Sequence, residues 1–266
     1  MTPKFGHGGR FHFLISAECD LPPTPIRMRY FVFSQQRTGS TLLTEALVGT
    51  GQAGVPIEYF NPDVGRDFWA RIGKGKPWRV KPYIDYIEKY RVTANGVCGF
   101  KSHLSQLNWF IDDPERQVRF TRRFDRVILS YRRDKIAQAV SFQRALAGGP
   151  WFVGTDRERK PTRPEELVLA RAAIVAAARS FVRQEARQRE LIRLAGVPML
   201  DLPYERLDAD FTGAMREVLA FLDLPAALAD GIGPPLQKLR DAASQEIVDR
   251  VVAALSETER RQLQPS

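Results

Sequence analysis

The sequence predicts an α/β fold, in which a parallel sheet is covered by helices on both faces within a single domain. Strand-like apolar runs alternate along the chain with segments of helical periodicity, which is the pattern of repeated βα units. The 266 residues suffice for one such domain with a substantial core. The hydrophobic share of 44% argues against a disordered chain.

The expected strands are short apolar runs. In chain order they cover residues 29–34, 54–58, 96–102, 126–131 and 198–202. The first reads Arg-Tyr-Phe-Val-Phe-Ser, and the fourth reads Arg-Val-Ile-Leu-Ser-Tyr. Both are rich in the aromatic and β-branched residues that suit a buried sheet. Their order in the sheet does not follow from the sequence.

The expected helices carry apolar residues three and four positions apart. In chain order they cover residues 40–50, 83–93, 105–111, 135–146, 164–195, 211–222 and 244–256. The long helix is expected to start at Pro164, because proline fits the first turn of a helix. The preceding stretch, residues 148–163, is rich in glycine, proline and charge and predicts a mobile loop or lid.

Residues 1–27 are expected to form an N-terminal extension before a domain of residues 28–266, and we expect this extension to be a peripheral tail. The short apolar piece at residues 11–17 is followed at once by Glu18 and Asp20, so it is too short for an export signal. No apolar run approaches the roughly 20 residues that span a bilayer. We therefore expect no transmembrane segment.

The turn between the first strand and the first helix is the most informative segment. Residues 34–41 read Ser-Gln-Gln-Arg-Thr-Gly-Ser-Thr. A strand that enters a helix through such a turn leaves backbone N–H groups directed at one spot, and the helix dipole adds positive potential there. The turn therefore predicts a cradle for a phosphate or a sulfate group. In the alternative reading, Gly39 relieves backbone strain, and Ser40 or Thr41 caps the helix.

The turn departs from the loop of nucleotide triphosphatases, which needs glycine, four spacers, then glycine, lysine and serine or threonine. Here Ser34 occupies the first glycine position and Ser40 the lysine position, and the nearby cation is Arg37. A planar guanidinium suits a bidentate grip on an anion. An ordinary ATP or GTP hydrolase is therefore disfavoured, although a nucleotide kinase or NTPase of P-loop ancestry stays an alternative.

The formal net charge is +9, from 40 basic and 31 acidic residues, and the isoelectric point lies near 9.8. Such a surplus attracts anionic small molecules and polyanions alike, so a basic nucleic-acid-binding protein is a second alternative. However, the arginines of residues 116–135 are interleaved with apolar residues, and no nucleic-acid-binding motif is present. We therefore expect no nucleic-acid partner.

The chain has two cysteines, Cys19 and Cys98, which are too few for a disulfide framework or a zinc site. We expect a reducing, cytoplasmic location and no metal. The carboxyl ends of parallel strands meet at one edge of a sheet, where ligands bind. That edge would bring together residues 34–41, Glu58, residues 101–103 and residues 131–133.

Three blocks of sequence resemble bacterial sulfotransferases of the trehalose 2-sulfotransferase-like family. The first is the turn followed by Gly-Val-Pro-Ile-Glu-Tyr-Phe at residues 54–60, and the second is Tyr-Arg-Arg-Asp-Lys-Ile-Ala-Gln-Ala-Val-Ser-Phe-Gln-Arg-Ala at residues 131–145. The third is Leu-Pro-Tyr-Glu-Arg-Leu at residues 202–207. The resemblance covers residues 28–250 and implies a P-loop-type sheet. It also implies the donor 3′-phosphoadenosine 5′-phosphosulfate (PAPS), and related enzymes form homodimers.

The resemblance implies a donor site of two parts. The 5′-phosphosulfate would be held by residues of the turn: Gln36, Arg37, Thr38, Gly39, Ser40 and Thr41. The 3′-phosphate would be held by Arg132 or Arg133 together with Ser141. The family pattern here is arginine, proline, aspartate, so the two consecutive arginines leave the choice between them open.

The resemblance also implies that Glu58 is the general base that activates an acceptor hydroxyl. The alternative base is His103, the one histidine at the expected edge of the sheet. Lys101 would meet the sulfate or the bridging oxygen, or would neutralise Glu58. Tyr59 and Phe60 are expected to contact the acceptor, a carbohydrate or a glycolipid. Residues 55–57, Val-Pro-Ile, stand where the trehalose enzyme carries more polar residues, which argues against trehalose itself.

Overall fold

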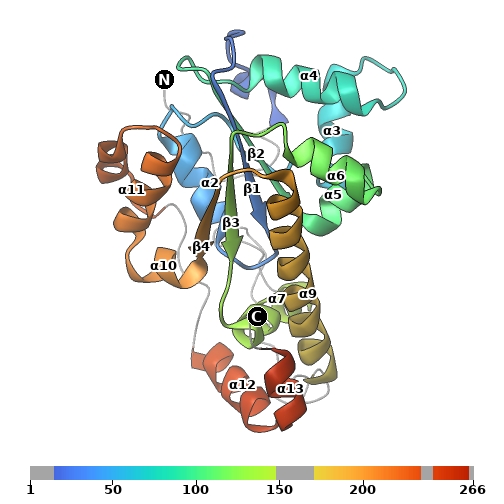
Figure 1. Cartoon of the computed structure of the whole chain (residues 1–266), viewed down its shortest axis with the longest axis vertical. Helices are drawn as coiled ribbons and strands as arrows, with labels where there is room; N and C mark the ends of the chain where they lie inside the picture. Colours follow the sequence, from blue (N-terminus) through green and yellow to red (C-terminus); the bar gives the residue numbers. More distant parts are fainter. Residues whose placement is uncertain (1–14, 148–170, 235–241, 264–266) are drawn as a thin grey trace.

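The computed structural model describes residues 15–147, 171–234 and 242–263. Within these residues the chain forms one four-stranded sheet (Figure 1). The strands are β1 (Met28–Ser34), β2 (Val97–His103), β3 (Arg126–Tyr131) and β4 (Met199–Pro203). All of them run parallel, in the order β2-β1-β3-β4. The predicted α/β fold is confirmed.

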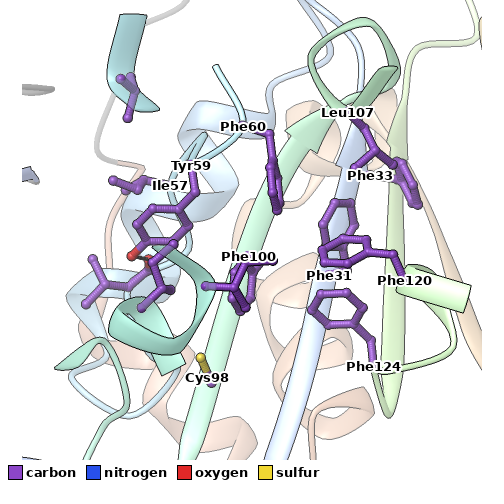
Figure 2. Close-up of a cluster of buried hydrophobic side chains, with 14 of the residues drawn as sticks. Phe31, Phe33, Ile57, Tyr59, Phe60, Cys98, Phe100, Leu107, Phe120 and Phe124 are labelled. Carbon is purple, nitrogen blue, oxygen red and sulfur yellow. Dashed lines mark hydrogen bonds between the residues drawn. The ribbon is translucent and has the colours of Figure 1, made fainter. Parts of the chain in front are cut away.

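One face of the sheet carries an aromatic core. Alternate residues of a strand point to opposite faces, so Phe31 and Phe33 of β1 lie beside Phe100 of β2 on this face (Figure 2). The covering helices are α3 (Pro62–Ile72), α4 (Val80–Tyr90), α5 (Leu104–Phe110), α6 (Pro114–Thr121) and α9 (Arg171–Ala195). The edge-to-face ring pairs of this core, such as Phe31 with Phe120, favour a single packing arrangement.

The opposite face of the sheet is covered by a smaller set of helices. Tyr30 and Val32 of β1 and Ile128 of β3 pack there against aliphatic side chains. The covering elements are α2 (Ser40–Gly49), α10 (Tyr204–Ala209), α11 (Phe211–Phe221) and the 3₁₀ turn η2 (Ala226–Gly231). Helices therefore lie on both faces of the sheet, as the alternation of strands and helices predicts (Figure 1).

A third apolar cluster lies beyond the sheet. The helices α7 (Lys135–Leu146) and α12 (Ala242–Ala253) meet there with the first half of α9. Leu255 and Leu263, which flank α13 (Glu257–Gln262), complete the cluster. Figure 1 shows α12 and α13 at the end of the molecule where α7 lies beside α9. The C-terminal part of the chain thus braces the helix that follows β3.

The expected strand at residues 54–58 is wrong. The segment has no strand conformation, although the Lys101 N–H donates to the Ile57 carbonyl over 3.1 Å. Gly54 has a φ of +69°, and a Cβ there would lie 2.8 Å from the backbone nitrogen of Gly99. Pro56 has no N–H to donate to a ladder. The segment therefore crosses close beside β2 without joining the sheet as a strand.

Several helices differ from the prediction in extent. The expected helix at residues 83–93 begins earlier, at Val80, and ends at Tyr90. Helices α3, α6, α10 and α13 were not expected. The starts of α3 and α6 had a local signal, because Asn61 and Asp113 cap them and a proline follows each cap. The expected helix start at residue 164 and the expected lid at residues 148–163 lie outside the described residues.

The described part of the N-terminal extension packs on the domain. Ile15 and Cys19 belong to the aromatic core cluster, and Asp20 forms ion pairs with Arg71 (2.6 Å) and Arg91 (3.0 Å). Residues 15–27 are therefore anchored, which corrects the expectation of a peripheral tail. Among the helices that the structure describes, none combines the length and the hydropathy needed to cross a bilayer.

Candidate functional site

The turn between β1 and α2 has an unusual backbone. Gly39, which caps α2, has a φ of +73°, and Arg37 has a φ of +65°. A left-handed backbone is uncommon for a residue with a Cβ and often marks a functional constraint. Turns of this kind form concavities lined by backbone N–H groups, which bind anions. The backbone thus fits the anion cradle that the sequence predicts.

Tyr204, at the start of α10, covers this turn. A Cβ on Gly39 would lie 2.8 Å from the Cδ2 atom of the Tyr204 ring, so only glycine allows the ring to pack there. The guanidinium of Arg132 lies 4.9 Å from the centre of the same ring, within the range of a cation–π contact. The turn, Arg132 and Tyr204 belong to three sequence blocks, which the fold brings together.

Arg37 connects the turn to α7. Its Nε donates to Ser141 Oγ over 2.9 Å. Burial, together with the nearby positive charge of Arg132, lowers the pKa of Arg37 to about 10, so the guanidinium stays protonated at neutral pH. Two neighbouring cations and a hydroxyl group are a suitable receptor for an anion.

Arg132 and Arg133 have different surroundings. Arg133 is exposed, and its backbone N–H donates to both carboxylate oxygens of Glu205 at 3.1 Å. Arg132 is half-buried beside Arg37 and Tyr204, and its carbonyl accepts a short hydrogen bond from Lys135 Nζ. The structure therefore brings Arg132, rather than the Arg133 side chain, to the turn.

Three buried glutamine side chains fix the turn through hydrogen bonds to backbone carbonyls. Gln188 Nε2 donates to the Ser34 carbonyl (2.8 Å). Gln35 Nε2 donates to the Phe181 carbonyl (2.8 Å), and Gln138 Nε2 donates to the Gln36 carbonyl (2.9 Å). We call Gln35, Gln138 and Gln188 the glutamine cluster. Because all three are fully buried, their hydrogen bonds fix the shape of the turn.

The remaining residues of the turn divide into two kinds. The Thr38 hydroxyl is fully buried and donates to the Gln35 carbonyl over 2.9 Å, so it stabilises the turn itself. Ser40 is also buried, whereas Thr41 is half-buried and its hydroxyl accepts a hydrogen bond from Lys101 Nζ (3.1 Å). Thr41 is thus the point at which the turn contacts β2.

Glu58 lies at the centre of a second polar group. Its Oε1 is 2.9 Å from Lys101 Nζ and 3.5 Å from His103 Nε2. Its Oε2 accepts hydrogen bonds from Gln106 Nε2 (2.6 Å) and Asn61 Nδ2 (3.2 Å). Lys101 and His103 are two residues apart on β2 and therefore point to the same face of the sheet. Glu58, Lys101 and His103 are thus brought together, as expected.

The electrostatics of this group favour an ionised Glu58. Burial raises the pKa of the carboxyl and is the largest single influence, but the charge of Lys101, the neighbouring His103 and the hydrogen bonds from Lys101 and Gln106 together outweigh it, so the pKa lies well below its ordinary value. Burial lowers the pKa of His103, so its imidazole is neutral at neutral pH. Ser34 Oγ lies 3.0 Å from His103 Nδ1 and orients the ring.

Tyr59 and Phe60 lie in the aromatic core rather than at a surface. Neither side chain is exposed, and Figure 2 shows both among the core residues. The Tyr59 hydroxyl donates to the Val55 carbonyl over 2.7 Å, and Phe60 packs edge-on against Phe110. The structure leaves these side chains no surface for an acceptor, so we do not include them in the acceptor site.

Gln106, Asn61 and Glu205 complete the site, and sequence reasoning assigned no role to the side chains of Gln106 and Glu205. Asn61 had a signal, since asparagine before proline is a common helix cap. Glu205 lies in the third block that resembles the family, but no local pattern predicts its contact with the Arg133 N–H. The contact of Gln106 with Glu58 also joins residues that are distant in the chain. In the described part of the chain, no group of three or more His, Cys, Asp or Glu residues could hold a metal ion.

Comparisons with known proteins identify relatives of this chain. A family model described as Stf0 sulphotransferase matches residues 29–254. A protein of Mycolicibacterium smegmatis named trehalose 2-sulfotransferase is 30% identical over 259 residues, which cover 83% of this chain and 93% of the relative. A protein of the same name from Mycobacterium tuberculosis is 28% identical over 254 residues, with the same coverages. A crystal structure of a sulfotransferase from Alicyclobacillus acidocaldarius aligns with 89% of this chain and 94% of its own, at 13% identity and a TM-score of 0.49.

Proposed function

The chain belongs to the Stf0 sulphotransferase family, and on that premise we propose that it transfers a sulfuryl group from PAPS to a hydroxyl group of a carbohydrate or glycolipid. One observation carries the proposal. Lys101 Nζ lies 2.9 Å from Glu58 Oε1 and 3.1 Å from Thr41 Oγ1, so a single cation joins the carboxylate to the anion-binding turn. Group transfer needs the acceptor oxygen and the donor group side by side.

In this proposal the donor is held at both of its charged ends. The turn from Gln36 to Thr41, with the Arg37 guanidinium, binds the 5′-phosphosulfate. Arg132 and Ser141 bind the 3′-phosphate, which carries close to two negative charges. The support for Arg132 over Arg133 is its position beside Arg37, whereas the Arg133 side chain is exposed.

Glu58 is the general base of the proposed reaction. Its carboxylate takes the proton of the acceptor hydroxyl as the acceptor oxygen bonds to sulfur. The bond between sulfur and the bridging phosphate oxygen breaks, which yields a sulfate ester and adenosine 3′,5′-bisphosphate. Lys101 is placed to stabilise the negative charge that develops on the bridging oxygen. The buried, neutral His103 lies beside Glu58, with its Nε2 3.5 Å from Oε1.

The acceptor class follows from the names of the relatives, which act on trehalose. Trehalose is therefore the first disaccharide to test, although residues 55–57 are apolar here. A cytoplasmic location and a homodimer stay predictions from the sequence.

The test is a transfer assay with radiolabelled PAPS and a panel of free sugars and glycolipids. We expect a sulfated sugar product, and we expect Glu58→Gln to lower kcat by about 10²- to 10⁴-fold without changing the affinity for adenosine 3′,5′-bisphosphate. Glu88→Gln is the control, because Glu88 forms ion pairs with Arg29 and Arg123. A fully active Glu58→Gln enzyme, or tighter binding of ATP than of the bisphosphate, would contradict the proposal.

A further inference from the structure

Gln106 makes contacts with both ends of its side-chain amide. Its Nε2 donates to Glu58 Oε2 over 2.6 Å. Its Oε1 accepts from the backbone N–H of His103 (2.9 Å) and lies 3.4 Å from the Ser102 hydroxyl. The side chain is buried, so water does not compete for these bonds. Gln106 thus links the start of α5 to the carboxylate.

The orientation of this amide is determined by its partners. A backbone N–H can only donate, so the amide group next to His103 N has to be the oxygen. The NH₂ group is then turned toward Glu58. This orientation supplies a neutral donor to an ionised carboxylate, which is a strong hydrogen bond.

The two carboxylate oxygens of Glu58 differ in how fully their contacts occupy them. Oε2 is engaged by two amide donors, from Gln106 and Asn61. Oε1 has Lys101 at 2.9 Å, whereas His103 at 3.5 Å is too far for a hydrogen bond of ordinary strength. Oε1 therefore keeps the weakest of the four contacts, and it lies on the side of Lys101, which also contacts the turn.

We propose that Gln106 is a positioning residue, which holds Glu58 by Oε2 so that Oε1, beside Lys101, receives the proton of the acceptor hydroxyl. The inference rests on the proposed role of Glu58 as the base. Gln106 contacts neither donor nor acceptor in this account. It acts only through the carboxylate, whose rotation it prevents.

Two substitutions separate this role from helix capping. Gln106→Glu keeps an oxygen that can accept from the His103 N–H, as in a capping box, but it removes the donor and places a second carboxylate beside Glu58. Gln106→Met removes both functions. The control is Gln117→Met, because Gln117 is also a buried amide, and its hydrogen bonds go to Asn108 and Ile111 rather than to Glu58.

The experiment measures kcat, acceptor KM and donor affinity against pH in the full-length chain. We expect both Gln106 variants to lower kcat by about tenfold or more, since a hydrogen bond to a charged group is lost, with donor affinity unchanged. We also expect the acid limb of the pH profile to move up by about one unit, and further in Gln106→Glu. Isotope-edited infrared titration of the Glu58 carboxyl gives the same shift without turnover.

The outcomes distinguish this inference from the proposed function. If Gln106→Glu keeps the kcat and pH profile of the wild type, or if Gln117→Met shifts them equally, the positioning role is wrong. If Glu58→Gln is inactive and the Gln106 variants behave as wild type, only the positioning role fails. If Glu58→Gln is fully active, the proposed function fails. Should Gln106→Met not fold, Gln106→Glu and its infrared titration decide the question.

Discussion

Arg37 Nε donates a hydrogen bond to Ser141 Oγ over 2.9 Å, and this contact joins the turn after β1 to α7 across 104 residues of sequence. The two residues belong to segments that are expected to bind opposite ends of PAPS. Their contact places the proposed sites for the 5′-phosphosulfate and the 3′-phosphate beside each other. The site therefore requires the relative position of α2 and α7 to be fixed.

Ser141→Ala is expected to weaken the binding of adenosine 3′,5′-bisphosphate. The hydroxyl accepts a hydrogen bond from the half-buried Arg37 and is a proposed donor to the phosphate, and a hydrogen bond to a charged group contributes about 1.5–3 kcal/mol. A loss of about tenfold or more in affinity should appear in isothermal titration calorimetry. Ser105→Ala, at an exposed serine of α5, is the control. Equal affinities of the two variants would remove Ser141 from the site.

Arg132→Ala and Arg133→Ala are expected to differ strongly. Arg132 lies beside Arg37 and over the Tyr204 ring, whereas the Arg133 side chain is exposed. We expect Arg132→Ala to weaken bisphosphate binding by about tenfold or more and Arg133→Ala to have a much smaller effect. Calorimetry with adenosine 5′-phosphosulfate, which lacks the 3′-phosphate, completes the test. Arg132→Ala should weaken the binding of this ligand less than it weakens the binding of the bisphosphate. The reverse ranking of the two variants would assign the 3′-phosphate to Arg133.

Gly39→Ala is expected to destabilise the turn and to displace Tyr204. The left-handed backbone costs a residue with a Cβ about 1–2 kcal/mol, and the new Cβ would meet the Tyr204 ring at 2.8 Å. Gly51→Ala is a matched control, because Gly51 has a φ of +66° and a Cβ there would meet nothing within 4 Å. Thermal unfolding should show a loss in both variants, but only Gly39→Ala should weaken bisphosphate binding. A similar loss of binding in Gly51→Ala would rule out a specific role for the Tyr204 contact.

Lys101→Met is expected to lower stability in a pH-dependent way. The variant leaves Glu58 buried without its cation, which costs about 3–5 kcal/mol at neutral pH. In the wild type the pKa of Glu58 is depressed below 4.5, so its stabilising effect is present above that pH and is lost as the pH falls through the folded-state pKa. In the variant, burial raises the pKa of Glu58, and protonation relieves the penalty.

Urea unfolding of the wild type and Lys101→Met, at about pH 7 and about pH 4, measures this effect. The difference in unfolding free energy between the two proteins should narrow at the lower pH. Lys81→Met is the control, because Lys81 forms an exposed pair with Asp85 and should change stability little at either pH. A difference that does not change with pH would mean that Glu58 and Lys101 do not form a charged pair.

The parts of the fold that were predictable are those with local signals. The strands of β1 and β3 and the turn before α2 follow from apolar runs and from the Gly39 position, and the structure has them close to the expected bounds. Segment 54–58 also looked like a strand, yet its position depends on Gly54 crossing close beside Gly99, which is a tertiary contact. Apolar composition alone does not distinguish a strand from an extended segment packed on a sheet.

The site was predictable where the charge of a residue decides its role, and less so where packing decides it. The position of Lys101 and His103 beside the turn follows from the carboxyl ends of parallel strands. Glu58 joins them from a segment that is not a strand but lies beside β2, where the Ile57 carbonyl accepts from the Lys101 N–H. From the sequence, the aromatic residues beside Glu58 could face either a sugar or the core. In the structure Phe60 packs against Phe100 and Phe110 and therefore belongs to the core. Gln106 gave no signal, because its amide acts on a residue 48 positions away.

The glutamine cluster makes the two halves of this chain dependent on each other. The turn is encoded near the N-terminus, but Gln138 on α7 and Gln188 on α9 hold it in shape. A fragment that ends before α9 would contain the whole motif but lack Gln188 and the Phe181 carbonyl that Gln35 contacts, so it should not bind nucleotide. In a chimera between relatives, the three glutamines would have to be exchanged together. Replacing one of them would leave a buried amide group of its neighbour without its hydrogen-bond partner.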